Sequence, residues 1–321
     1  MKKIIITGCA GFIGSSISLK LLKNGFFVYG IDNYDSYYDV NIKKSNIKRL
    51  QEFDNFCFQK SDIRSVDKLN NLMKIDLCIH LAAIPGVIPS IKNKERYHDF
   101  NVNGTKNLLK FLKKINVSNI IFASSSSLYS EGEAKIFNEI KSEKNPLSPY
   151  GRTKLNCEKI INIWGEETNG TVMNLRFFSV YGPWIRPDLA ILKFTSNILN
   201  DRPINIFGDG NSYRDYTYID DVTDGVLNAV AYMFKNRRTI QTLNLGNGTP
   251  VKLLELVHVI EKELNKKAII NYLPYNKVEM KYTCADLTKS RKLLNYAPKT
   301  NIYDGIENFI HWYKKHSHLY E

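Results

Sequence analysis

The sequence of 321 residues is 43% hydrophobic, so it can bury a large core and predicts one large domain with a smaller one beside it. Its formal net charge is +13. Basic residues never run beyond pairs and acidic residues lie between them, which is typical of a solvated surface and argues against a nucleic-acid partner. The same positive field would suit an anionic small molecule.

The cysteines are odd in number and widely separated, form no Cys-x-x-Cys motif and are accompanied by no histidines at metal-ligand spacing: Cys9, Cys57, Cys78, Cys157 and Cys284. They predict reduced thiols in a cytoplasmic protein, with neither a disulfide framework nor a metal site. The first residues, MKKIIITG, contain only three isoleucines before Thr7, which is too short for a signal peptide and predicts a buried strand. No apolar run reaches membrane-spanning length, so we expect no membrane partner.

Short apolar runs alternate with helical patterns and predict buried strands at residues 4–7, 27–31, 77–81, 120–123 and 172–177. The stretches between them are long enough for crossover helices, so the fold class is α/β with a Rossmann-type doubly wound parallel sheet. After Phe178 the chain is rich in Gly, Pro and Asp with interleaved aromatics, which predicts a smaller, loop-heavy C-terminal domain over the carboxyl edge of the sheet. Strand and helix patterns return at Thr242, so the boundary is not a clean cut.

The first predicted strand runs into TGCAGFIGSS, where Gly8, Gly11 and Gly14 are spaced G-x-x-G-x-x-G at a strand-to-helix turn. A phosphate can approach a backbone without Cβ atoms, and the following helix offers free N–H groups and the positive end of its dipole. The next strand ends with Asp32, whose carboxylate can accept both hydroxyls of a ribose and would repel a 2′-phosphate. Unless the glycines form an ordinary turn, these features predict an NAD site. Asp62, after the strand-like FCFQK, predicts either an adenine contact or a helix cap.

The segment PLSPYGRTKL places Tyr150 and Lys154 at i and i+4, so on a helix both side chains emerge from one face. Ser148 and Pro149 precede them, as expected at a helix start. An ammonium about 5 Å from the phenol would favour the phenolate by about 3 kcal/mol at an effective dielectric of about 20, which makes the tyrosine a usable base. The pair alone could equally be packing on a helix.

Three more motifs are collinear with these features: HLAA at residues 80–83, NVNGT at residues 101–105 and SSSSLY at residues 124–129. Together with the glycine spacing and the Tyr150/Lys154 pair, they resemble the extended short-chain dehydrogenase/reductases of the nucleotide-sugar branch. The resemblance runs from residue 4 to about residue 315. Within the branch, the segments IDNYDSYYDVNIKKSNIKRL, LRFFSVYGPWIRPDLAILKFT and RDYTYIDD most resemble UDP-glucuronate 4-epimerases.

The resemblance implies which residues form the site. Tyr150, Lys154 and Ser125 would be catalytic. The residues expected to hold NAD are Gly8, Gly11, Phe12, Ile13, Gly14, Asp32, Asn33, Asp62, Ile63, Leu81, Ala82, Ala83, Asn101, Tyr150 and Lys154. The residues expected to contact the UDP-sugar are Ser125, Ser126, Ser127, Ser179, Arg186 and Arg214, with Arg214 on the pyrophosphate, where a surface salt bridge is its alternative role.

The implied reaction is C4 epimerisation of a UDP-sugar, from UDP-glucuronate to UDP-galacturonate. Tyr150 would take the proton of the sugar 4-hydroxyl while hydride leaves C4 for NAD; the 4-keto intermediate would then turn and take the hydride back on its other face. A ketone β to a carboxylate is prone to lose carbon dioxide, so the carboxylate must be held still. By resemblance Arg186 holds it with help from Ser179; an exposed loop arginine is the alternative.

Two departures from the resemblance concern the sugar pocket. Glucuronate epimerases usually show Gly-Val-Arg-Tyr after HLAA, whereas this chain has Ile88 in place of the arginine, and Ser130 replaces a glycine. A 4-epimerase of a neutral UDP-hexose or UDP-N-acetylhexosamine is therefore the nearest alternative. A 4,6-dehydratase would need an acid and a base where this chain has Ser126 and Ser127. A non-catalytic, NAD-responsive binding protein is a hypothesis of a different class.

By resemblance, residues 1–178 form the NAD-binding Rossmann domain, with segments near residues 215–246 returning to it, and residues 179–321 mainly bind the UDP-sugar. Relatives commonly dimerise through the helices that follow Asn101 and Tyr150, so a homodimer is expected. The leucines and phenylalanine of NGTKNLLKFLKKI stand at helical spacing, but that stripe could equally face the sheet.

Overall fold

The computed structural model describes residues 1–68, 74–130, 135–275, 278 and 280–320. Its main layer is a seven-stranded sheet in the order β11-β6-β5-β4-β1-β2-β3, and all its neighbouring strands are parallel. The strands are β1 (Lys3–Thr7), β2 (Phe27–Asp32), β3 (Phe56–Lys60), β4 (Leu77–His80), β5 (Asn119–Ser125), β6 (Thr171–Phe177) and β11 (Ile240–Leu245). The winding direction reverses between β1 and β4, as in a Rossmann fold. The predicted fold class is confirmed.

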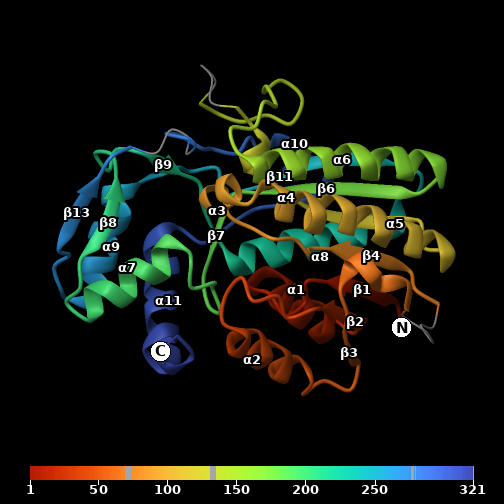
Figure 1. Cartoon of the computed structure of the whole chain (residues 1–321), viewed down its shortest axis with the longest axis horizontal. Coiled ribbons are helices and arrows are strands. Elements are labelled where there is room, and N and C mark those ends of the chain that lie inside the picture. The colour runs from red at the N-terminus through yellow and green to blue at the C-terminus, as the bar shows by residue number, and fades with distance from the viewer. Residues whose placement is uncertain (69–73, 131–134, 276–277, 279, 321) are drawn as a thin grey trace.

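Helices cover both faces of the sheet because its strands are apolar on both sides (Figure 1). In β1, Ile4 and Ile6 point into one core with helix α1 (Phe12–Lys23) and helix α8 (Ile219–Lys235). Ile5 points into a second core with α5 (Gly104–Lys114) and α6 (Pro149–Glu167). This alternation follows from the two-residue period of a strand, and it encloses the sheet between two helical layers.

The five predicted strands are β1, β2, β4, β5 and β6, with bounds that differ by one or two residues. The region after Phe178 is more regular than predicted, because three short strands lie in the segment 200–221 that the composition assigns to loops. They are β8 (Ile204–Phe207), β9 (Tyr213–Arg214) and β10 (Tyr216–Tyr218). Their partners are β13 (Ile270–Leu273), β12 (Val251–Lys252) and β7 (Ser179–Tyr181). Strands this short, paired mostly with distant segments, have no local period to reveal them.

A second lobe gathers at one end of the molecule, on the left in Figure 1, around α7 (Ala190–Leu199), α9 (Leu253–Leu264) and α11 (Ile302–His316). The other helices are α2 (Val40–Leu50), α3 (Val87–Lys92), α4 (Lys94–Tyr97), α10 (Thr288–Leu294) and the short turns η1 (Ile63–Lys68), η2 (His98–Asn103), η3 (Ser126–Leu128) and η4 (Ser317–Leu319). Across the described ranges, no helix has both the length and the apolar character that a membrane crossing needs. All five cysteines are free thiols.

The loop between β7 and α7 joins the two lobes through Trp184, whose φ of 66° is left-handed and unfavourable for a bulky residue. The guanidinium of Arg49 lies 4.2 Å from the Trp184 ring, and the Trp312 ring lies 5.4 Å away, centre to centre. The hydroxyl of Tyr320 donates to the carbonyl of Ile185 at 2.7 Å. Packing from α2, α11 and the C-terminal turn therefore holds this loop in its strained shape.

Helix α6 is fixed to the sheet by a buried ion pair between Glu158 and Arg176 of β6. Arg176 donates to the two carboxylate oxygens at 2.9 and 2.7 Å, and both side chains are almost fully buried. Ser124 donates to the same carboxylate at 2.5 Å, and Arg176 also donates to the Tyr129 hydroxyl at 2.9 Å. A buried charge pair is tolerated only when its hydrogen bonds are satisfied, so this network fixes the position of α6 over the ends of β5 and β6.

His80 links the central strands to helix α5. Its Nδ1 lies 2.7 Å from the Thr7 hydroxyl of β1, and its Nε2 lies 3.0 Å from the Thr105 hydroxyl of α5. The ring is fully buried, and burial together with the nearby charge of Lys154 lowers the pKa of His80 to about 3. The folded protein therefore holds this imidazole neutral at any pH above about 3.

The buried His80 predicts an acid-sensitive fold. Its pKa is about 6.5 in an unfolded chain and about 3 in the folded protein, so between these values only the unfolded state binds the proton. The free energy of unfolding should therefore fall as the pH drops below about 6.5, by up to about 1.4 kcal/mol per pH unit from this residue. Urea unfolding of wild type and His80→Asn from pH 7 to 5 checks this. Equal slopes for the two proteins would contradict it.

Candidate active site

Every residue expected to touch cofactor or substrate, except Asn101, lines one cavity of about 900 Å³. The cavity lies at the carboxyl ends of the central strands, next to the reversal between β1 and β4, where open α/β sheets bind ligands. Residues of the second lobe close its other side, among them Asn197, Phe207, Tyr216 and Met280. The cavity can therefore hold an extended ligand that reaches from the glycine turn to the second lobe.

The glycine turn between β1 and α1 fits a dinucleotide pyrophosphate. Gly8 has a φ of 76°, and a Cβ there would lie 2.7 Å from the backbone nitrogen of Ala82. A Cβ on Gly14 would lie 2.0 Å from the Gly8 carbonyl oxygen, so α1 packs directly against the turn. Gly11, the N-cap of α1, lines the cavity and leaves space for a close approach. Backbone N–H groups at a helix start without Cβ atoms in the way are the requirements for binding phosphate.

Asp32 lies at the end of β2, 8% exposed, where a cofactor ribose is expected. Its two oxygens accept the backbone N–H groups of Ala10 at 3.1 Å and Tyr34 at 2.8 Å, and each oxygen keeps a lone pair for a hydroxyl. Burial raises the pKa of Asp32, while the charge of Lys43 and these hydrogen bonds act in the opposite direction. Lys43 is itself buried, lines the cavity and donates to the Asp35 carbonyl at 2.6 Å.

Asp62 shows the helix-cap geometry that the sequence leaves open. Its carboxylate accepts the backbone N–H of Arg64 at 2.8 Å, two bonds from the Arg64 guanidinium, and the amide of Asn33 at 2.9 Å. Asn33 and Asp62 line the cavity together with Ile63, so the adenine contact stays a prediction.

Asn101 supports the cofactor site from behind instead of lining the cavity. Its side chain is 2% exposed and exchanges two hydrogen bonds with the backbone of Ile84, at 2.8 and 3.1 Å. Its amide also donates to the Thr153 hydroxyl at 3.0 Å, one residue before Lys154. The polar atoms of Asn101 thus tie the loop after β4 to α6, and the direct cofactor contact expected of it stays a prediction.

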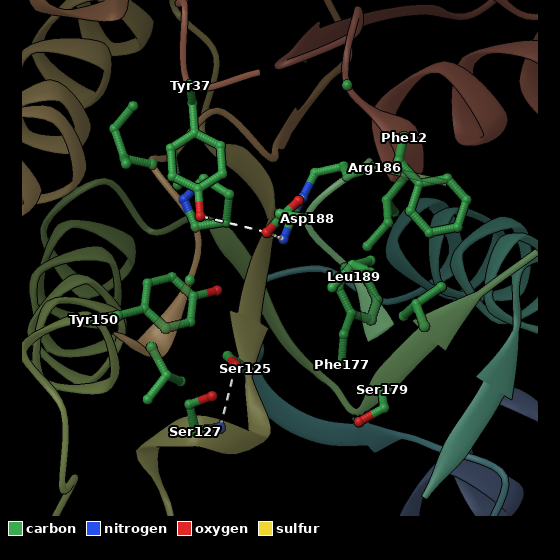
Figure 2. A pocket seen from close by; sticks show the side chains of 18 of the residues that line it. Phe12, Tyr37, Ser125, Ser127, Tyr150, Phe177, Ser179, Arg186, Asp188 and Leu189 are labelled. Atoms are coloured by element: carbon green, nitrogen blue, oxygen red, sulfur yellow. Dashed lines mark hydrogen bonds and ion pairs between the residues drawn. The ribbon is translucent and has the colours of Figure 1, made fainter. Parts of the chain in front are cut away.

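Tyr150 and Lys154 lie one turn apart in α6, and both line the cavity. Ser148 caps the helix by accepting from the Gly151 N–H at 3.1 Å, and Pro149 occupies the first turn, as predicted. The Lys154 ammonium is buried, donates to the Ala123 carbonyl at 2.7 Å and lies 6.0 Å from the centre of the Tyr150 ring. Figure 2 shows the Tyr150 hydroxyl pointing into the cavity. The pair thus places a phenol and a fixed positive charge beside the same space.

The serine run ends β5 below Tyr150 in Figure 2. Ser125 accepts the Ser127 N–H at 3.1 Å and caps the short turn η3, so its hydroxyl has a fixed position and can still donate its proton. Ser126 and Ser127 are half-buried and line the cavity. Ser179 enters the cavity from β7, and its backbone N–H donates to the Asp215 carbonyl at 3.0 Å. These serines line the same cavity as Tyr150.

Arg186 faces the same space from the loop before α7 (Figure 2). It is not an exposed loop arginine, because its side chain is only 19% exposed. It forms a two-point ion pair with Asp188, in which Nε and one Nη donate at 2.9 Å each. Burial alone would lower the pKa of Arg186, but the charge of Asp188 and its hydrogen bonds raise it. Arg186 is thus a fixed cation within electrostatic reach of Tyr150.

Arg214 lies in β9 at the far side of the cavity, where its guanidinium donates to the Tyr213 carbonyl at 3.0 Å. Ile88, one of the two departures from the resemblance, lies in the first turn of α3 and lines the cavity. The other departure, Ser130, does not adopt a positive φ, so the backbone there needs no glycine.

Sequence reasoning did not single out Asp188, Tyr37, Lys43 or the Glu158–Arg176 pair. Signals for some of them are present: Asp188 follows Arg186 by two residues, and Tyr37 and Lys43 lie within a segment that carries the family resemblance. No local pattern reveals which carboxylate an arginine chooses, because that depends on the folded loop.

Comparisons with known proteins agree with this geometry. A family model described as the NAD dependent epimerase/dehydratase family matches residues 4–246. A curated UDP-glucuronate 4-epimerase of Thermodesulfobacterium geofontis is 36% identical over 319 residues, which cover 98% of this chain and 97% of that protein.

Solved structures agree as well. The UDP-glucuronic acid 4-epimerase of Bacillus cereus in complex with UDP-glucuronic acid and NAD has a TM-score of 0.91 at 37% identity, over 98% of this chain and 99% of that one. A UDP-glucose 4-epimerase of Thermotoga maritima with UDP-glucose has a TM-score of 0.88 at 28% identity, over 98% and 99% of the two chains. Given its fold, its cavity and these matches, the chain belongs to the NAD dependent epimerase/dehydratase family.

Proposed function

We propose that this chain is an NAD-dependent UDP-sugar 4-epimerase that interconverts UDP-glucuronate and UDP-galacturonate. The observation that carries the proposal is that Tyr150 and Arg186 face one space from opposite sides (Figure 2), in a cavity that also contains the glycine turn. One group can exchange a proton with a sugar hydroxyl, and the other can bind a sugar carboxylate. The Bacillus cereus relative in complex with UDP-glucuronic acid and NAD supports the same substrate and cofactor.

The chain's own residues supply the acid and base. Tyr150 takes the proton from the sugar 4-hydroxyl and returns it in the second half of the cycle, with the Lys154 ammonium as a fixed positive charge 6.0 Å from the centre of its ring. Ser125 donates a hydrogen bond to the same sugar oxygen, where negative charge develops. Bound NAD would supply the hydride acceptor and donor for C4. Gly8, Gly11 and Asp32 would hold the cofactor at the glycine turn and the end of β2.

The substrate must stay attached while its sugar turns. Arg214 is suited to the pyrophosphate, because a guanidinium presents several donors in a plane to phosphate oxygens. Arg186 binds the sugar carboxylate, with Ser179 as a further donor from β7. These anchors lie on β7, on the loop between β7 and α7 and on β9, whereas Tyr150 lies on α6 of the Rossmann half, so the sugar is held between them.

A neutral UDP-hexose is the second candidate substrate class. Asp188 neutralises Arg186, and Ile88 carries no charge where glucuronate epimerases usually have arginine, so the pocket is less positive than the resemblance implies. The experiment that separates the two classes is turnover of UDP-glucuronate against UDP-glucose and UDP-N-acetylglucosamine. Activity with the neutral sugars alone would overturn the preferred substrate.

A homodimer that packs α5 and α6 against their copies, in a cytoplasmic protein with reduced thiols, completes the proposal. The apolar stripe of α5 faces the sheet, since Leu108, Leu109, Phe111 and Leu112 are buried. Ile163, 56% exposed on α6, is then the apolar contact open to a partner.

Sedimentation equilibrium should accordingly give twice the chain mass of 37.0 kDa. Ile163→Glu should shift the equilibrium toward monomer, because it places a charge in the apolar contact. A wild-type monomer at micromolar concentration would contradict the dimer.

Removing the Tyr150 hydroxyl should abolish turnover without preventing binding. Tyr150→Phe loses the proton carrier and should lower kcat by a factor of about 10² to 10⁴. UDP-sugar and NAD affinities, measured by calorimetry, should change little. Tyr303→Phe, an exposed tyrosine on α11, is the matched control and should keep wild-type turnover. Wild-type kcat in Tyr150→Phe would exclude the proposed chemistry.

Replacing Arg186 should affect the acidic sugar selectively. Arg186→Met removes the donors for a carboxylate, so kcat/KM for UDP-glucuronate should fall by about 100-fold, the equivalent of about 2.7 kcal/mol. Any turnover of UDP-glucose should change by less than about tenfold, because no carboxylate contact is lost. Arg237→Met, on an exposed arginine, is the control. An equal loss for both sugars would mean that Arg186 does not read the carboxylate.

A further inference from the structure

The Arg186 guanidinium is held along one edge. Of its five N–H donors, the one on Nε and one on Nη2 go to the two oxygens of Asp188, each at 2.9 Å. Both Nη1 donors and the second Nη2 donor have no protein partner within the described residues. A planar guanidinium that is gripped along one edge presents the opposite edge in a fixed plane. Arg186 and Tyr150 line the same cavity, so these free donors are available to a ligand there.

We propose that Asp188 is a positioning residue for Arg186, which fixes the plane in which the free edge of the guanidinium binds the substrate carboxylate. This inference rests on the proposed function and deepens it. Asp188 need not touch the substrate, because it acts by orienting the group that does.

Asp188 is itself fixed from a second direction. The Tyr37 hydroxyl donates to its Oδ2 at 3.4 Å, so the carboxylate is gripped from the β2–α2 loop as well as from its own loop. Tyr37 can lie there because Gly86 has no side chain: a Cβ on Gly86, whose φ is 101°, would collide with the Tyr37 hydroxyl. Three segments distant in sequence therefore converge on the plane of one guanidinium.

The charges of Arg186 and Asp188 indicate that the pair orients the substrate carboxylate and does not simply attract it. Arg186 holds the pKa of Asp188 below its usual range although burial acts to raise it, so both partners are charged at neutral pH and together are neutral. A neutral pair offers an incoming carboxylate little net Coulomb attraction. The pair instead presents two hydrogen-bond donors in a fixed plane, and these set the orientation of the carboxylate. Once C4 is oxidised, that orientation decides whether the 4-keto intermediate keeps its carboxylate or loses it as carbon dioxide.

In the 4-keto intermediate, the C5–C6 bond to the carboxylate can break only when it aligns with the π orbitals of the ketone. Its electron pair then stays on C5 as an enolate, which takes up a proton, and C6 leaves as carbon dioxide. The product is a UDP-4-ketopentose, and the cofactor stays reduced because the ketone is no longer returned to an alcohol. A carboxylate held in the ketone plane does not reach this alignment.

The test is the partition between epimerisation and carbon dioxide release. Wild type, Asp188→Asn and the control Asp76→Asn are each incubated with UDP-glucuronate labelled in its carboxylate, and labelled carbon dioxide and UDP-galacturonate are counted. Asp76 pairs with Lys2, and its replacement removes an ion pair outside the cavity. We expect Asp188→Asn to raise the ratio of carbon dioxide to UDP-galacturonate by about tenfold or more, with wild-type ratios in the control.

A double variant separates positioning from a general structural effect. If Asp188 acts through Arg186, adding Asp188→Asn to Arg186→Met should not change the ratio further. Tyr37→Phe keeps the ion pair of Arg186 and Asp188 and should raise the ratio of carbon dioxide to UDP-galacturonate by a smaller factor. This variant tests the inference if Asp188→Asn does not fold. An unchanged ratio in the folded variants, or a loss of both products in equal proportion, would overturn the inference while leaving the epimerase intact. Absence of any product from wild type would overturn the proposed function and this inference together.

Discussion

The buried pair of Glu158 and Arg176 is the constraint on which the site depends. Lys154 and Glu158 stand at i and i+4 of α6, so the contact that anchors Glu158 to β6 also sets the rotation of the helix that carries Tyr150 and Lys154. Isolated buried charges are strongly unfavourable, and this pair is stable because Ser124 and Tyr129 complete its hydrogen bonds. The face of α6 that carries Tyr150 and Lys154 is thereby held toward the ends of β5 and β6.

The two halves of the molecule contribute different groups to the site, and the topology explains which half contributes which. The sheet supplies rigid strand ends, and at the winding reversal these leave room for a dinucleotide beside the glycine turn. Arg186 comes from a loop and Arg214 from a two-residue strand, both beyond β6. Tyr150 and Lys154 therefore lie on a helix packed against the central sheet, whereas Arg186 and Arg214 lie on segments outside that sheet.

The sequence predicts the central fold and the cofactor turn well because both depend on local pattern. Apolar runs such as residues 4–7 are buried on both faces. The glycines at the strand-to-helix turn, Gly8, Gly11 and Gly14, are spaced so that α1 can pack against the turn, where a Cβ on Gly8 or Gly14 would collide with the backbone. The short strands β8, β9 and β10 were not predicted, since each is defined by a partner elsewhere in the chain. Asn101 shows the other limit: a motif identifies a residue, but whether it lines a cavity or supports the lining from behind depends on tertiary contacts.

Trp184 has a bearing on how the molecule comes together. A left-handed conformation at a bulky residue costs about 1 to 3 kcal/mol, so an isolated loop would relax out of it. Its stabilising contacts come from Arg49 near the start of the chain and from Trp312 and Tyr320 near the end. The loop that carries Arg186 therefore depends on both ends of the chain for its shape, and loss of the segment from Trp312 onward would remove two of the three contacts that hold it.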